Sequence, residues 1–107
     1  MKETCIVIAA YNEEKNIESL LHKMQEQLSD KAYFVIIVND GSIDKTKEIA
    51  EQFSETMPIK IISHEKNLGV GAAFRNGFNA ALEKAQSNDI IVTKEADNTS
   101  DLSILDT

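Results

Sequence analysis

The sequence is poor in several residue types that would otherwise mark out a class of protein. Cys5 is the only cysteine among 107 residues, which excludes an internal disulfide, and its place inside an apolar run predicts core packing. His22 and His64 have no second histidine or cysteine at zinc-ligand spacing, so a zinc site is not expected. The apolar run at residues 4–10 is too short for a signal peptide or a membrane span. The chain is therefore expected to be soluble and cytoplasmic.

Positive charge is also scarce. The sequence contains 11 lysines and arginines and 18 aspartates and glutamates, which gives a net charge of −7 at pH 7. Because no excess of basic residues is present to neutralise phosphates, a nucleic-acid partner is not expected. A smaller phosphate-bearing ligand is not excluded, since a metal ion and helix N-termini can hold it.

Two well-known nucleotide loops are missing as well. Gly69, Gly71 and Gly77 do not have the spacing of the dinucleotide loop G-x-G-x-x-G, and no G-x-x-x-x-G-K-[ST] loop is present. The small residues around Gly69 and Gly71 more simply allow a helix and a strand to approach each other closely.

What the sequence does contain is a regular alternation of elements. Apolar runs at residues 4–10, 33–38, 59–62 and 90–93 predict four short strands, the third opened by the single proline. Apolar residues at helical spacing between 17 and 28, 44 and 53, and 71 and 84 predict three helices. The third helix is expected to turn one side inward, formed by Phe74, Phe78, Ala81, Leu82 and Ala85. This order predicts one α/β domain over residues 1–107, with a parallel sheet and helices on both faces.

Residues 38–46 connect the second expected strand to the second expected helix. They follow a buried strand and read as a tight turn that leads into a helix, with Asp44 expected at its N-cap. Asp40 then stands at the carboxyl end of the strand, the edge of an open α/β sheet where ligands bind. A turn that only connects two elements would have the same composition.

Polar residues follow the other strands too. Glu13, Asp40, Glu95 and Asp97 bring carboxylates to three of the four expected strand ends. Like charges close together repel unless a cation intervenes, and carboxylates suit Mg²⁺ or Mn²⁺. Glu95 and Asp97 can point to the same side of the chain. By spacing alone, two solvated carboxylates at the start of a loop are the simpler interpretation.

Four motifs in order carry a resemblance. They are Ala-Tyr-Asn-Glu at residues 10–13, Asn-Asp-Gly-Ser-x-Asp-x-Thr at 39–46, Asn-x-Gly-x-Gly-x-Ala-x-x-x-Gly at 67–77, and Glu-Ala-Asp at 95–97. Together they resemble the nucleotide-binding half of family 2 glycosyltransferases, above all the dolichyl- or polyprenyl-phosphate sugar transferases. The likeness spans residues 6–97, and the joint occurrence of the motifs is far more specific than any one of them.

The resemblance implies a GT-A fold, which is a Rossmann-like α/β sandwich, and a nucleotide-diphosphate sugar bound with Mg²⁺ or Mn²⁺. It implies that Tyr11 and Glu13 border the nucleotide, that Val38 lines the same pocket and that Asp40 bonds the base. A tyrosine at a strand end more often covers the edge of the core, which is the simpler interpretation of Tyr11. Substrate contacts are also implied for the family's Asp-x-Asp position, here Glu95, Ala96 and Asp97, of which Glu95 and Asp97 would hold the metal. The reaction implied is displacement at the anomeric carbon of the sugar by an acceptor, for which a polyprenyl phosphate is a candidate.

The sequence departs from the family pattern in three places. Ala9 stands where the family commonly has proline, and Glu95 replaces the first aspartate with a longer carboxylate. The sequence also stops soon after Asp97, so the acceptor site and the catalytic base are expected beyond Thr107. We therefore expect a truncated domain that binds nucleotide weakly, transfers no sugar alone and leaves apolar surface open to self-association. Membrane association of a full-length protein is compatible with this resemblance.

Two other classes of function remain open on sequence grounds. A non-catalytic nucleotide-binding or regulatory module could keep the same fold, and Lys94 and Glu95 at the metal motif give this alternative some weight. A flavodoxin- or receiver-like domain also uses carboxylates at strand ends, but it needs a phosphoacceptor aspartate with a lysine from a later strand. Asp40 or Asp97 with Lys94 matches that requirement poorly.

Overall fold

The chain alternates strands and helices from one end of its described part to the other. The computed structural model describes residues 3–84 and 90–95. Its elements are β1 (Thr4–Ala10), α1 (Glu14–Gln27), β2 (Tyr33–Asp40), α2 (Thr46–Phe53), β3 (Ile59–His64), α3 (Val70–Lys84) and β4 (Ile90–Glu95). None of the helices in these two stretches is long and apolar enough to cross a bilayer.

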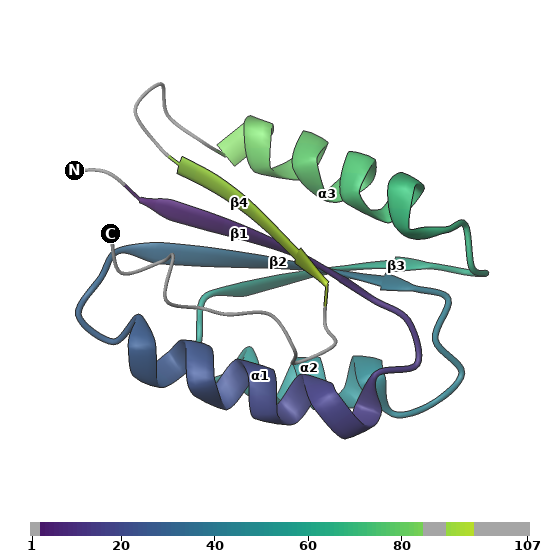
Figure 1. Ribbon diagram of the computed structural model, residues 1–107, viewed down its shortest axis with the longest axis horizontal. Coiled ribbons are helices and arrows are strands. Elements are labelled where there is room, and N and C mark those ends of the chain that lie inside the picture. The colour runs from purple at the N-terminus through teal and green to yellow at the C-terminus, as the bar shows by residue number, and fades with distance from the viewer. Residues whose placement is uncertain (1–2, 85–89, 96–107) are drawn as a thin grey trace.

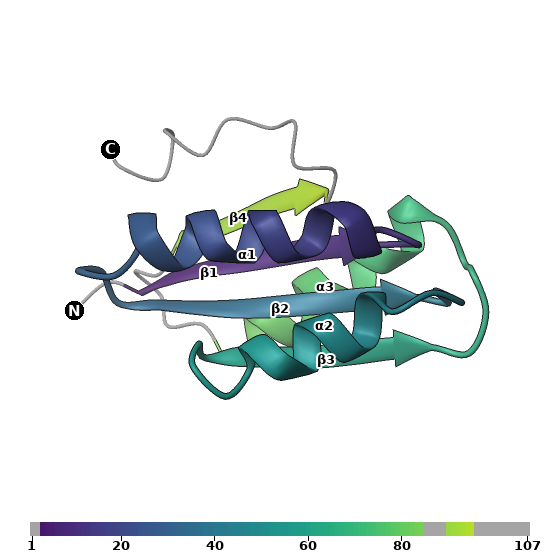
Figure 2. The same ribbon diagram turned by 90° about the horizontal axis from the view of Figure 1, so that it is seen from below.

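The four described strands form one parallel sheet in the order β3-β2-β1-β4. Helices α1 and α2 cover one face of the sheet and α3 covers the other (Figure 1). Seen from the side of α1 and α2, the strand arrows point the same way (Figure 2). The predicted α/β architecture is therefore confirmed, and the loops that enter all three helices leave the sheet at one edge.

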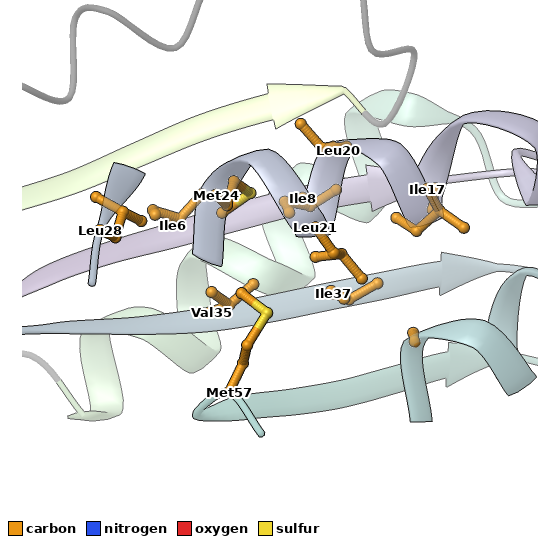
Figure 3. Packing of buried hydrophobic residues seen from close by; sticks show 12 residues of the cluster. Ile6, Ile8, Ile17, Leu20, Leu21, Met24, Leu28, Val35, Ile37 and Met57 are labelled. Atoms are coloured by element: carbon orange, nitrogen blue, oxygen red, sulfur yellow. The ribbon is translucent and has the colours of Figure 1, made fainter. Parts of the chain in front are cut away.

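The face under α1 holds the larger part of the core. Ile17, Leu20, Leu21 and Met24 are buried at helical spacing, as the periodicity predicted. Figure 3 shows these side chains against those of Ile6, Ile8, Val35 and Ile37 from the two central strands. Each fully buried side chain of this size contributes about 1.5–3 kcal/mol, so this layer fixes how α1 sits on the sheet.

The face under α3 is packed differently from the prediction. Ala73, Gly77 and Ala81 are its buried residues, whereas Phe78 and Leu82 are 41% and 53% exposed. The prediction that these two large residues point inward was wrong. Small residues seat the helix close to the sheet, which turns the larger side chains outward; Ala85 lies outside the described residues.

Gly77 shows how close that contact is. A Cβ atom at this position would overlap Val7 Cγ1 and lie 2.9 Å from Val38 Cγ2. Any larger residue would therefore push α3 away from β1 and β2.

The strands extend further than their apolar runs. β2 continues past Val38 to Asp40, and β3 runs to His64, because backbone pairing in register does not depend on apolar side chains. α2 begins at Thr46 rather than near Asp44. Cys5 is buried, as predicted.

Candidate functional site

The carboxyl ends of the strands form one rim. The register pairs Ala9 on β1 with Glu95 on β4, and Asp40 on β2 with His64 on β3. The loop that begins at Tyr11 follows directly after β1. Positions from four strands that are far apart in sequence are thus neighbours at the edge where α/β proteins bind ligands.

The loops after β1 and β2 are bonded to each other. Ser42 Oγ accepts the Asn12 N–H at 3.0 Å, and Asn12 Oδ1 accepts the Ile43 N–H at 2.9 Å. Asn12 has a φ of 52°, a left-handed conformation that asparagine tolerates better than most residues. The exchange of bonds fixes the two loops relative to each other.

Asp44 and Thr46 extend this connection to the starts of α1 and α2. Thr46, which is fully buried, donates its hydroxyl and its N–H to Asp44 Oδ1. The same hydroxyl oxygen accepts the Glu13 N–H at 2.9 Å, and Asp44 Oδ2 accepts the Glu14 N–H at 3.2 Å. Asp44 therefore satisfies orphan donors at the start of two helices rather than serving as the N-cap of α2, which is Lys45.

Electrostatics agree with this role of Asp44. Burial raises the pKa of its carboxyl, but hydrogen bonds from Thr46 and from the Glu14 N–H outweigh burial and lower the pKa below the usual value. Asp44 is consequently ionised at neutral pH and accepts bonds throughout the physiological range.

Asp40 organises the loop that follows β3. Its side chain accepts four hydrogen bonds: Oδ1 from His64 Nδ1 and the Leu68 N–H, both at 2.8 Å, and Oδ2 from Asn67 Nδ2 at 3.1 Å and the Gly69 N–H at 2.9 Å. The residue is only 3% exposed. These four bonds match the roughly four acceptor positions of a carboxylate.

The charge of Asp40 is stabilised by the same contacts. Burial raises the pKa of the Asp40 carboxyl, yet the bonds from His64, Leu68 and Gly69 outweigh that effect and lower the pKa. The buried carboxylate therefore stays ionised and holds residues 64–69 against the end of β2.

Gly41 allows the loop that contains Lys66 and Asn67 to pack closely against the end of β2. Its φ is 76°, and a Cβ atom there would overlap the backbone of Lys66 and Asn67. Beside it, His64, Glu65, Lys66 and Leu68 line a shallow hollow of about 360 Å³. The hollow lies on the loop that Asp40 positions.

The other residues predicted to border a nucleotide have distinct positions. Tyr11 is 46% exposed on the loop after β1. Glu13 is partly buried, and its Oε2 accepts a bond from Asn16 Nδ2 at 2.8 Å. Val38 is fully buried in the layer under α3. Tyr11 thus offers an accessible ring at the rim, whereas the Val38 side chain belongs to the core.

The predicted metal ligands lie partly outside the described residues. Glu95 ends β4 at the rim, but its side chain is not described, and Ala96 and Asp97 lie beyond the described stretch. Within residues 3–84 and 90–95, no three histidine, cysteine, aspartate or glutamate side chains form a metal-binding group. The backbone of residue 95 pairs with Ala9 on β1, and a carboxylate is the type of donor that suits a hard cation such as Mg²⁺ or Mn²⁺.

Comparison with known proteins decides the family. The family model of glycosyl transferase family 2 matches residues 5–101. The chain belongs to glycosyl transferase family 2. It is 34% identical over 92 residues to the dolichol-phosphate mannosyltransferase of Pyrococcus furiosus, a match that covers 86% of this chain and 25% of that protein.

Solved structures of related transferases share the fold of this family 2 chain. A mannosyltransferase from Pyrobaculum calidifontis in complex with GDP-Man and Mn²⁺ matches with a TM-score of 0.71 and 26% identity, over 88% of this chain and 27% of that one. S. aureus TarS 1-349 in complex with UDP-GlcNAc matches with a TM-score of 0.69 and 27% identity, over 91% of this chain and 27% of that one. The chain thus spans about a quarter of the length of these relatives.

Sequence reasoning about this family 2 chain missed the partners of its two buried aspartates. His64 was expected at the end of the third strand and not as a zinc ligand, but its bond to Asp40 across two adjacent strands was not predicted. Thr46 was read only as part of a motif, yet it joins the starts of two helices. The Asp-x-Thr spacing at a helix start could have suggested the local bond to Asp44, but the contacts across the rim depend on strand register.

Proposed function

We propose that this chain forms the nucleotide-sugar-binding part of a transferase that moves a sugar from a nucleoside diphosphate to an acceptor. The observation that carries the proposal is the rim, where three loops from separate strands are bonded into one surface in a member of a family of glycosyltransferases. Two of its structural relatives are described in complex with GDP-Man and Mn²⁺ or with UDP-GlcNAc. A nucleoside-diphosphate sugar is therefore the ligand class that we assign to the rim.

Each residue of the rim would have a separate role in binding the nucleotide sugar. The exposed ring of Tyr11 would stack on the base, and Glu13 would border the nucleotide. Asp40, held ionised, would position the loop that borders the base, and Val38 would support the floor of the nucleotide site from within the core. Glu95, Ala96 and Asp97 would contact the sugar nucleotide.

Glu95 and Asp97 would also hold Mg²⁺ or Mn²⁺. When bound, this ion would stabilise the negative charge of the departing nucleotide diphosphate. The acceptor that we propose is a polyprenyl phosphate, because the Pyrococcus furiosus relative is a dolichol-phosphate mannosyltransferase. The catalytic base is proposed to lie in sequence beyond Thr107.

Calorimetric titration of the chain with UDP- and GDP-sugars, with and without Mn²⁺, tests the proposal. We expect affinity that depends on the metal and falls by about tenfold or more in Asp97→Asn and Glu95→Gln. Glu26→Gln is the matched control, because Glu26 is exposed on α1 and outside the proposed site. If no nucleotide sugar binds in a metal-dependent way, the proposal fails and a non-catalytic module is the better interpretation.

A further inference from the structure

His64 connects three elements at the rim. Its Nδ1 lies 2.8 Å from Asp40 Oδ1, and its Nε2 lies 2.9 Å from Asn76 Nδ2 on α3. The side chain of His64 is only 9% exposed. A histidine in this position ties the ends of β2 and β3 to the helix that follows the Asp40-bonded loop.

The two contacts are compatible with one arrangement of protons. The Asn76 amide nitrogen can only donate, so Nε2 accepts, and Nδ1 must then carry the ring proton that is donated to Asp40. This is the neutral tautomer protonated at Nδ1. In this form His64 links Asn76 on α3 to the carboxylate of Asp40. The position of the helix can therefore influence the orientation of the carboxylate.

What depends on Asp40 is the loop at residues 66–69. Its carboxylate fixes the Asn67 side chain and the backbone N–H groups of Leu68 and Gly69, and Asn67 Nδ2 also reaches the Asp40 carbonyl at 3.2 Å. Because a carboxylate can rotate about its bond to Cβ, the donor on the side of His64 helps to decide its orientation. Loss of that donor would leave Oδ1 with the Leu68 N–H alone, which would loosen the orientation of the carboxylate and of the loop bonded to it.

We propose that His64, supported by Asn76, is a positioning residue for nucleotide-sugar binding, which it serves by orienting the Asp40 carboxylate. The inference rests on the proposed function. It does not require His64 to touch the ligand, and it holds whether Asp40 contacts the base or only shapes the loop beside it.

Two variants that each keep a polar group near one ring nitrogen separate the contact of His64 with Asp40 from its contact with Asn76. His64→Asn puts an amide nitrogen near the place of Nδ1 and keeps a donor for Asp40, whereas His64→Gln keeps a polar group near Nε2 for Asn76. We expect His64→Ala and His64→Gln to weaken Mn²⁺-dependent binding of UDP- or GDP-sugar by about tenfold, since a bond to a charged group is lost. His64→Asn should restore most of the affinity, and Asn76→Ala should weaken binding by less than His64→Ala.

The experiment is calorimetry on the chain well below its unfolding temperature, with the thermal midpoint of each variant measured in parallel. A residue with a merely structural role would lower the midpoint in these variants and leave the affinity of the folded chain unchanged. Equal affinity of wild type and His64→Ala, or no rescue by His64→Asn, overturns the positioning role alone. Absence of any Mn²⁺-dependent binding by wild type instead overturns the proposed function, and the positioning role with it.

Nitrogen-15 NMR of the ligand-free chain at about pH 8 gives a readout that is independent of binding. We expect the His64 signals of a ring protonated at Nδ1, and a change in them in Asn76→Ala. His22 is the internal reference, because its ring packs edge-on against Phe53, with the ring centroids 4.9 Å apart, on the other face of the sheet from α3 (Figure 1). A His64 ring protonated at Nε2 would contradict the proposed bond to Asp40.

Discussion

Asp40 and Asp44 lie four residues apart, and each holds a different pair of segments together. Asp44 joins the starts of α1 and α2, while Asp40 joins the end of β2 to the loop that enters α3. Both carboxyls have a lowered pKa because bonds to the charged form outweigh the cost of burial. Their charges therefore stabilise the fold at the place where a ligand is proposed to bind.

A dependence of stability on acid follows from the lowered pKa of Asp40. In the unfolded chain an aspartate titrates at about 3.9, so the contribution of the ionised group is fully present above that pH. It is lost as the pH falls through the lower pKa of the folded state. We expect Asp40→Asn to be less stable than wild type at pH 7 by about 1–3 kcal/mol, and to lose less stability on acidification below about pH 4.

Urea unfolding between about pH 2.5 and 7 measures this difference. Asp30→Asn is the control, because the side chain of Asp30 is 83% exposed and its Oδ1 lies as far as 3.9 Å from Lys31 Nζ. The slope of unfolding free energy against pH in the acid range should be smaller in Asp40→Asn than in Asp30→Asn. Parallel curves for the two variants would show that the bonds to Asp40 do not stabilise its charge.

At the scale of whole elements, sequence periodicity predicted a great deal. The stripe from Ile17 to Met24 was identified correctly because a long amphipathic helix against a sheet leaves a strong signal. The inward side of α3 was identified only in part. Phe74 and Ala81 do pack against the sheet, but Phe78 and Leu82 do not, and the closest contact is made through Gly77. Hydrophobicity ranks alanine and glycine low, although close approach to a sheet requires them.

A substitution at Gly77 tests whether close contact between α3 and the sheet stabilises the fold. We expect Gly77→Ala to destabilise the chain by about 1–3 kcal/mol, even though alanine favours helices, because its methyl group overlaps Val7 and crowds Val38. Gly71→Ala is the control within the same helix, since nothing lies within 4 Å of the added methyl group, and it should be neutral or stabilising.

A double-mutant cycle identifies the contact responsible. Val7→Ala removes the overlapping methyl groups, so the double variant Gly77→Ala, Val7→Ala should be more stable than the sum of the single effects predicts. Urea unfolding of the four proteins gives the coupling free energy. Strict additivity would mean that α3 moves away from the sheet without meeting Val7.

For the whole molecule, the topology predicted where the candidate site lies, but it did not predict the hydrogen bonds between the residues of the site. Parallel strands joined by helices must bring Tyr11, Asp40 and Glu95 to one edge, so their common rim followed from the order of elements alone. The bonds of Asp40 to His64 and to Leu68 depend on the register of β2 and β3 and on the path of a loop. Neither quantity is encoded in a local pattern that a single sequence displays.

The whole molecule also presents apolar surface on α3. Phe78 and Leu82 lie one turn apart on the helix and are 41% and 53% exposed, while Phe74, one turn earlier, is partly buried against the core. Since water-exposed apolar side chains gain free energy when two such surfaces meet, we expect the 107-residue chain to self-associate as its concentration rises.

Sedimentation equilibrium of the chain and of the double variant Phe78→Glu, Leu82→Glu tests this expectation. The two charges should raise the dissociation constant by about tenfold or more, because half-exposed side chains of this size each contribute on the order of 1 kcal/mol when covered. The double variant Gln27→Glu, Gln52→Glu places the same two charges on exposed positions of α1 and α2, across the sheet from α3, and should leave association nearly unchanged (Figure 1). A wild-type chain that stays monomeric at high concentration, or a double variant that associates equally, would show that this side of α3 does not drive contact between copies.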